Sequence, residues 1–328
     1  MGVIFMAMTA QEKKDAKAEK LYFKKHKSSF KTKPGDVVFN IINYTFFLIF
    51  TLICIFPFYY LFINTISDNE LVQRGVINFF PRGIHIDNYI RILQVNDMFR
   101  AFGVTVLRTV IGTALMVVAS AFIGYLVTQQ LMWKRSLWYR FLVITMYFNA
   151  GIIPWYMNMS MLGLTNNFMA YIIPGIVAPY NIILVKTYIE GIPAELEESA
   201  KLDGASYMKI FTSIIWPLSK PILATIAIFG AVGQWNSFQD SLILMQSRPE
   251  LYTLQHRLYI YLNTTSNLSA LMSAGSTSGI SQQVLESALN GKVIKYTISM
   301  VTIIPILLVY PFMSKYFEKG IMLGAVKG

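Results

Sequence analysis

The sequence has 328 residues, of which 55% are hydrophobic and 14% are charged, and its mean hydropathy is +0.49. This composition excludes a water-soluble domain of that length, because such domains carry about 25% charged residues. A helix needs about 20 mostly apolar residues to cross a bilayer. Six such runs occur, at residues 38–66, 102–128, 141–161, 168–189, 219–245 and 295–314. The sequence therefore predicts an all-α membrane protein with six transmembrane helices.

The formal net charge of +11 is unevenly distributed along the chain. In a soluble protein this net charge would suggest binding to nucleic acid. In a membrane protein, basic residues beside apolar spans are retained on the cytoplasmic side of the membrane. They gather before the first run, in the second and fourth loops and after the last run, at positions that include Lys24, Lys25, Lys134, Arg135, Arg140, Lys201, Lys209, Lys315 and Lys319. We therefore predict that both termini are cytoplasmic. We expect membrane lipid, and not nucleic acid, as a partner of the chain.

The chain is expected to divide into a basic cytoplasmic tail, residues 1–36, and a transmembrane domain, residues 37–328, with its core at 100–314. The tail is interpreted as a solvated anchor rather than a partner-specific element. It lacks the small-residue cleavage site of a signal peptide. The one cysteine, Cys54, lies in the first run, where we expect a core residue. A disulfide within the chain is therefore excluded.

Two loops of the transmembrane domain are long enough to have their own structure. The cytoplasmic loop covers residues 190–221, and the external loop covers residues 246–293. In the external loop, the Ser, Asn, Thr and Gly residues between Asn263 and Ser281 predict irregular structure. A short helix is expected to follow over Ser281–Leu289.

The cytoplasmic loop has the pattern of two short helices joined by a turn. Pro193 can start a helix, and Glu195, Glu197 and Glu198 fall in its first turns, where negative charge suits the helix dipole. Asp203 precedes Gly204, which can adopt the left-handed conformation that ends a helix. Helical spacing then resumes, with Ile210, Phe211, Ile214 and Ile215 on one face, until Pro217 and Pro221 interrupt it. The loop is predicted to form a helical elbow.

This loop resembles the EAA loop of permeases from ABC importers. That signature has Glu-Ala-Ala, three residues, Gly, nine residues and Ile-x-Leu-Pro, and its positions correspond to Glu198, Ser199, Ala200, Gly204, Ile214 and Pro217. Ser199 and Trp216 depart from it, in place of an Ala and a Leu. The resemblance implies that the elbow inserts into a cleft of a partner ATPase, through Glu195, Glu197, Glu198, Ser199, Ala200, Asp203, Gly204, Ala205, Phe211, Ile214 and Pro217. The alternative is an amphipathic helix pair that rests on lipid headgroups.

Other segments are similar to permeases of carbohydrate importers related to the maltose-transporter G subunit. They are the end of the chain, residues 315–328, and the Gln-Trp-Asn-Ser-Phe segment at 234–238. Tyr310–Phe312 and the long external loop are more similar to the branch that handles complex oligosaccharides. The resemblance implies a bacterial cytoplasmic membrane, a homologous permease partner in a heterodimer, two ATPase copies and an extracellular solute-binding protein.

Catalytic chemistry is missing from the sequence. It has no Gly-x-x-x-x-Gly-Lys-Ser/Thr loop, so ATP and Mg are expected on the partner ATPase, with no cofactor on this chain. His26, His85 and His256 are interpreted as surface residues without the spacing of a metal site. Ionisable residues are scarce inside the apolar runs, which argues against a secondary carrier driven by an ion gradient. That carrier and a non-transporting scaffold or receptor are the alternatives to an importer subunit.

Sugar passage needs polar groups that exchange hydrogen bonds with hydroxyls, and aromatic faces that stack on pyranose rings. The third and fifth runs supply candidates: Asn149, Trp155, Tyr156, Gln234, Trp235, Asn236 and Gln239. Trp235, Asn236 and Gln239 are expected on one helical face. Aromatic belts and contacts between helices are the competing explanation for each residue. Arg108, in the second run, is interpreted as reaching the headgroups or pairing structurally with another chain rather than as contacting substrate.

Overall fold

The computed structural model describes residues 34–94, 96–273 and 291–311. Contacts divide the chain into two units, residues 1–59 and 60–328, which are described separately. Residues 1–33 of the basic tail, the helix predicted over Ser281–Leu289 and the C-terminal segment 315–328 lie outside the described residues, whereas residues 34–36 already belong to the first helix. Every element described is helical.

The first unit contains most of helix α2, Pro34–Thr65. Its side chains are apolar on all faces, and Phe46, Phe47 and Phe50 are among those exposed. A helix of this kind is suited to lipid rather than water. Cys54 is exposed on it, so the prediction of a core position is wrong. Within the first unit, the apolar residues of this helix are exposed and do not pack into a protein interior.

The second unit begins with the buried end of α2, at Ile63, Asn64 and Thr65. Helix α3, Asn69–Gln73, follows because the Asp68 carboxylate accepts hydrogen bonds from the amides of Glu70 and Leu71. Helix α4, Asp87–Gln94, leads into the next long helix.

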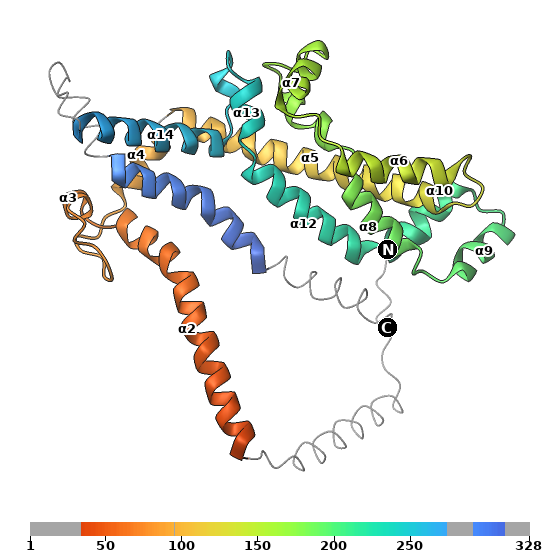
Figure 1. Ribbon diagram of the computed structural model, residues 1–328, viewed down its shortest axis with the longest axis horizontal. Helices are drawn as coiled ribbons and strands as arrows, with labels where there is room; N and C mark the ends of the chain where they lie inside the picture. Colours follow the sequence, from red (N-terminus) through yellow and green to blue (C-terminus); the bar gives the residue numbers. More distant parts are fainter. Residues whose placement is uncertain (1–33, 95, 274–290, 312–328) are drawn as a thin grey trace, which may run out of the picture. The chain divides into compact units, whose positions relative to one another are not determined.

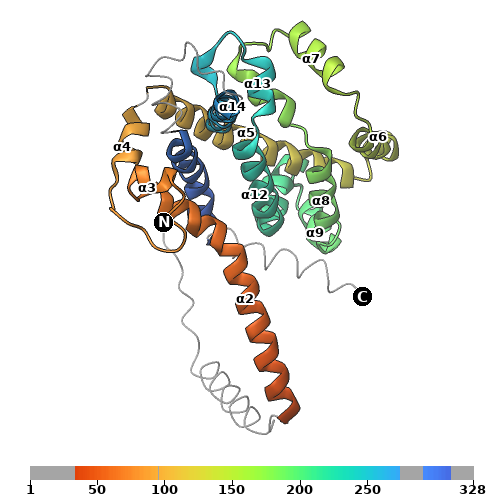
Figure 2. The ribbon, with the colours of Figure 1, turned by 60° about the vertical axis from the view of Figure 1, so that its left-hand side comes forward.

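Helix α5, Asn96–Thr128, packs along α12, Lys220–Asn236, and along α8, Pro179–Ile189 (Figures 1 and 2). Glycines permit this close approach. A Cβ on Gly124 would lie 3.0 Å from the Val185 Cγ1, and one on Gly230 would lie 2.3 Å from the Met116 Cε. Small residues have this role in membrane helix pairs, where backbones must come close to gain packing energy.

The predicted third and fourth runs are both interrupted. The third divides into α6, Arg135–Tyr147, and α7, Ile152–Met161, separated by an extended Phe148. The fourth begins with two 3₁₀ turns, η1 at Phe168–Tyr171 and η2 at Ile173–Gly175, and bends by 41° into α8. Each of these two runs is therefore divided into shorter helical segments.

The cytoplasmic loop and the fifth run form a longer series of short elements. Helix α9, Ala194–Leu202, is followed by α10, Tyr207–Ile210, the π-helical turn η3, Phe211–Ile215, and α11, Trp216–Leu218. The chain bends by 78° before α12. The fifth run is not one helix, because α12 stops at Asn236 and α13 occupies Gln239–Leu244.

The external segment is more helical than its composition predicts. After the 3₁₀ turn η4, Pro249–Leu251, helix α14 runs over Leu254–Ser273. The loop predicted from Asn263 is therefore wrong as far as Ser273. A final helix occupies Gly291–Pro311.

Among the described helices, three are long and apolar enough to cross a membrane unaided, Pro34–Thr65, Met98–Thr128 and Gly291–Pro311. The two bent pairs, Phe168–Ile189 and Tyr207–Asn236, would bring the number to five. The described helices therefore account for up to five of the six predicted crossings. The remaining predicted crossing is the one that contains α6 and α7.

Candidate functional site

The first arm of the elbow is α9, and none of its residues is buried. Glu195 and Glu197 occupy its first turn and Lys201 its last, so both signs of charge suit the helix dipole. The Lys201 Nζ lies 2.9 Å from the Glu197 Oε1. Glu198 and Ser199 are exposed. This arm therefore presents charged and small side chains outward.

Gly204 ends this arm in the way the sequence predicts. Its φ is +76°, and its amide donates to the Lys201 carbonyl at 3.0 Å, while the Ala205 amide donates to the Ala200 carbonyl at 2.9 Å. This pair of bonds defines a Schellman turn. A Cβ added to Gly204 would meet no atom within 4 Å, so the need for glycine here is conformational and not steric.

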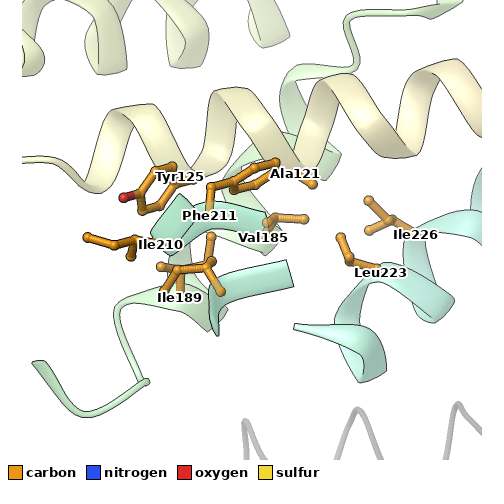
Figure 3. Close-up of a cluster of buried hydrophobic side chains, with 9 residues drawn as sticks. Ala121, Tyr125, Val185, Ile189, Ile210, Phe211, Leu223 and Ile226 are labelled. Atoms are coloured by element: carbon orange, nitrogen blue, oxygen red, sulfur yellow. The ribbon is translucent and has the colours of Figure 1, made fainter. Parts of the chain in front are cut away.

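The second arm anchors the elbow to the helical body. The Ser206 Oγ accepts from the Lys209 amide at 3.3 Å and starts α10. Ile210, Phe211 and Ile215 are then buried in a cluster formed with residues of α5, α8 and α12 (Figure 3). The partners are Ala121, Tyr125, Val185, Ile189, Leu223 and Ile226. The Phe211 ring stacks on Tyr125 with centroids 5.4 Å apart.

The residues of the resemblance are thus divided between the two arms. Ala200 and Ala205 pack against the edge of the buried cluster. Ile214 is half-buried, while Asp203 and Pro217 are exposed. Pro217 does not interrupt the second helix as predicted, because it lies in the first turn of α11, where a missing amide hydrogen is tolerated. The interruption comes at Ser219.

Three exposed apolar side chains at the elbow were not identified from the sequence. Leu202 is 90% exposed, and Tyr207 and Met208 are also exposed. They flank the Gly204 turn. A cavity of about 450 Å³ lies beside α9, lined by residues that include Gln129, Arg135, Glu190 and Glu198. The sequence feature that could have predicted this exposed group is Leu202, an apolar residue at the end of a mostly polar helix.

A second feature lies nearer the N-terminal end of α5. It is a cavity of about 370 Å³ lined by parts of α5, α7, η1, η2, α8, α12 and α13. Two predicted transport residues, Trp155 and Gln234, are brought together in its wall although they are far apart in the sequence. On α5, Arg108 lies at this cavity and Tyr125 lies at the anchor of the elbow. Their separation of 17 residues corresponds to about 25 Å along a helix.

Arg108 is 2% exposed and lies in this wall. Its Nη2 donates to the Asp240 Oδ2 at 2.5 Å, and its Nε donates to the Gln234 Oε1 at 3.0 Å. The guanidinium carbon is 4.4 Å from the centre of the Tyr171 ring. Arg108 therefore does not reach for headgroups. It pairs structurally, but its partner is Asp240 of the same chain and not a residue of another chain.

The other predicted transport residues do not gather at this cavity. Trp235 is buried in a separate cluster, where its Nε1 donates to the Thr302 carbonyl at 3.1 Å. Asn236 and Gln239 are not buried, and the break after Asn236 removes the single helical face predicted for them. The Asn149 Oδ1 accepts from the Gly151 amide at 2.9 Å, and Tyr156 is exposed on α7.

His256 is buried, contrary to the prediction of a surface residue. Its Nδ1 lies 2.9 Å from the Ser241 Oγ, and Ser241 follows Asp240 in α13. Burial, together with the positive charge of Arg257, lowers the pKa of His256 to about 4. A neutral histidine thus joins α14 to α13.

Broken apolar helices, a cavity with a buried ion pair in its wall and a helical elbow are the features of a polytopic membrane protein. No family model matches the chain. It belongs to the permease subunits of ABC sugar importers, as full-length relatives show. Protein LplC of Bacillus subtilis is 34% identical, over 90% of this chain and 97% of that protein. The polygalacturonan/rhamnogalacturonan transport system permease protein YtcP of the same organism is 34% identical, over 89% and 99%.

A solved structure is also similar. It is a bacterial ABC transporter involved in the import of the acidic polysaccharide alginate, with a TM-score of 0.76 and 28% identity over 87% of this chain and 98% of that one. As a permease subunit, the chain is not an enzyme, and ATP hydrolysis belongs to a partner ATPase.

Proposed function

We propose that this permease translocates oligosaccharides derived from complex polysaccharides across a bacterial cytoplasmic membrane. An extracellular solute-binding protein would deliver the sugar. A homologous permease would complete the channel, and two copies of a cytoplasmic ATPase would bind ATP and Mg. The names of YtcP and of the alginate transporter mention polysaccharides, which supports an oligosaccharide as the substrate. The acidity of those two polysaccharides is not assigned to this chain.

The observation that carries the proposal is that the elbow has one buried arm and one exposed arm. Its second arm is fixed to α5, α8 and α12 through Phe211 and its neighbours, while α9 and Leu202 remain uncovered. A partner that moves the exposed arm would therefore move the membrane helices with it. Leu202, Tyr207 and Met208 supply the apolar contact that a docking surface needs at its centre.

The proposed topology has six crossings with both termini in the cytoplasm. Helices α6 and α7 would together form the third crossing, and the bent pairs that end in α8 and α12 the fourth and fifth. The elbow then lies on the cytoplasmic side, and α14 lies outside. The wall that contains Trp155 and Gln234 is this subunit's share of the sugar path.

Gly204→Asp tests the coupling role in the reconstituted complex with its ATPase and binding protein. At a φ of +76° a side chain is strained by about 1 kcal/mol, and the added charge would face the partner. We expect sugar uptake and stimulated ATPase activity to fall at least tenfold. Unchanged activities would refute coupling through the elbow.

Gly163→Asp is a matched control for that experiment. Gly163 also has a positive φ, +67°, and open space around its Cβ position, but it lies between α7 and η1. It should carry the same strain without touching the ATPase, so uptake should stay within about twofold of the unmodified complex.

Uptake that followed an ion gradient and ignored ATP would instead identify a secondary carrier.

A further inference from the structure

The cavity beside Arg108 has an unusual charge arrangement. Within the part of its wall that the structure describes, Arg108 and Asp240 are the charged residues. Arg108 is 2% exposed, whereas the Asp240 side chain is 17% exposed. The wall is thus formally neutral, and the carboxylate is the more accessible of its two charges.

The guanidinium of Arg108 is fully engaged by neighbouring groups. Gln234 Oε1 accepts from its Nε and Nη2, at 3.0 and 2.8 Å, and the Asp240 carboxylate accepts from its Nη1 and Nη2. Such a two-pronged pair is the strongest contact that arginine makes with a carboxylate. No nitrogen of Arg108 is left over for a carboxylate on a ligand.

Asp240 is itself held in place by short local bonds. Its Oδ1 accepts from the Ser237 Oγ at 3.1 Å and from the Ser241 amide at 2.8 Å. These two donors, a hydroxyl and a backbone amide, lie at the break between α12 and α13. They hold the Asp240 carboxylate in one position. An asparagine at 240 could keep both of these acceptor contacts.

Uncharged groups of the wall remain for a ligand. The Thr113 Oγ1 is buried and, among the described residues, has no hydrogen-bond partner. The Gln234 Nε2 makes one bond, to the Tyr171 carbonyl at 3.3 Å. Trp155 adds an aromatic surface. The volume of about 370 Å³ falls within the range of small-molecule sites, and hydroxyl-binding groups beside an aromatic ring suit a sugar.

We propose that Asp240 acts as a built-in counter-ion that withholds Arg108 from the sugar, so that this wall accepts uncharged pyranose rings through Thr113, Gln234 and Trp155. This inference rests on the proposed function, because it assumes that the cavity belongs to the sugar path. It assigns to Asp240 the role of a specificity-determining residue. Without this carboxylate, Arg108 would favour sugars that carry a carboxylate of their own.

The test compares two trimers that have the same sugar backbone and differ in whether their carboxyl groups are charged or methyl-esterified. They are α-1,4-linked trigalacturonate and the same trimer with every carboxylate methyl-esterified. Binding of each to the purified full transporter, without the solute-binding protein, is measured by saturation-transfer NMR. We expect the unmodified complex to bind the ester about threefold or more tightly than the acid. Asp240→Asn should reverse the preference, with at least a tenfold change in the affinity ratio.

The double variant Arg108→Gln with Asp240→Asn separates charge from structural damage. It removes both charges, so its affinity ratio should return toward that of the unmodified complex. The inference is refuted if Asp240→Asn leaves the ratio unchanged, if the double variant behaves like the single one, or if neither trimer binds the unmodified complex. ATP-driven uptake is measured separately, so each of these failures leaves the importer function intact.

Thr113→Val gives a readout that does not disturb the ion pair. Valine has nearly the shape of threonine but lacks the unpaired hydroxyl, and this exchange lies away from the helix break. We expect both trimers to bind a few-fold more weakly, with the ratio between them unchanged. If Asp240→Asn cannot be purified, unaltered binding by Thr113→Val would by itself refute the sugar contact.

Discussion

At the scale of single residues, Arg108 shows how a full charge is kept within an apolar helix. The stretch Met98–Thr128 includes an 18-residue window with a mean hydropathy of 2.2, and an unpaired arginine in this helix would be costly. Asp240, Gln234 and Tyr171 surround the guanidinium, and each comes from a segment distant in sequence. Removing one partner of such a buried pair costs about 3 to 5 kcal/mol, because the other charge is left uncompensated.

His256 is a residue whose burial makes stability depend on pH. Its pKa in the folded protein is about 4, below the ordinary value of 6.5, so the folded state binds fewer protons than the unfolded state. The stabilisation is complete above about pH 6.5 and declines as the pH falls toward 4. At pH 5 the loss is on the order of 2 kcal/mol.

We therefore expect the Tm of the purified protein in detergent to fall by several degrees between pH 7.5 and pH 5. His256→Asn should flatten this dependence, since asparagine does not titrate and can still contact the Ser241 hydroxyl. Thermal unfolding followed at each pH provides the measurement. An equal pH dependence in the variant would show that other groups are responsible.

At the scale of elements, the π-helical turn η3 determines how firmly the elbow is attached. Phe211 is its buried anchor, in contact with the rings of Phe122, Tyr125 and Trp216. Phe211→Ala should lower stability by about 3 kcal/mol, the usual cost of removing a buried aromatic ring. It should also lower the sugar transported per ATP hydrolysed, because motion of α9 would no longer reach α5 and α8.

Thr212→Ala is the control for that variant. Thr212 is the next residue but is exposed, and its hydroxyl bonds only within the helix, to the Met208 carbonyl at 2.9 Å and the Lys209 carbonyl at 3.4 Å. Tm and the ratio of uptake to ATPase activity should both stay close to those of the unmodified complex. If Phe211→Ala kept the normal ratio despite a lower Tm, the anchor would be structural and not part of coupling.

At the scale of the whole molecule, the proposed six-crossing topology would place the elbow and η4 on opposite sides of the membrane. Cys54 is the one cysteine, so Cys54→Ser provides a background without thiols. On it, Glu198→Cys and Glu250→Cys each add one exposed thiol. A maleimide that cannot cross membranes should label position 250 in intact cells. It should label position 198 only after the cells are opened.

Labelling of both positions from the same side would contradict the topology. One crossing, through α12, separates them in the proposed arrangement. A lack of labelling at 198 in opened cells that carry the ATPase, with labelling restored when the ATPase is absent, would in addition support docking at the elbow.

Local patterns in the sequence were sufficient to predict the membrane class, most apolar runs and the two arms of the elbow. Apolar length, charge at a helix end and the glycine at 204 act over a few neighbouring residues, so they can be read without a fold. The structure confirms the Gly204 turn and the burial of Ile210, Phe211 and Ile215. Leu202 was missed because its exposure depends on what the fold leaves uncovered.

The tertiary structure alone decided where the fifth run breaks and which polar residues meet. The helix α12 ends at Asn236, which separates Asn236 from Gln239, and the fold places a buried cluster against Trp235 and the wall with Trp155 against Gln234. The partner of Arg108 lies 132 residues away, and His256 is buried by a contact with Ser241. Helical periodicity carries no information on such pairings, because a buried charge is matched by whichever element the fold brings to it.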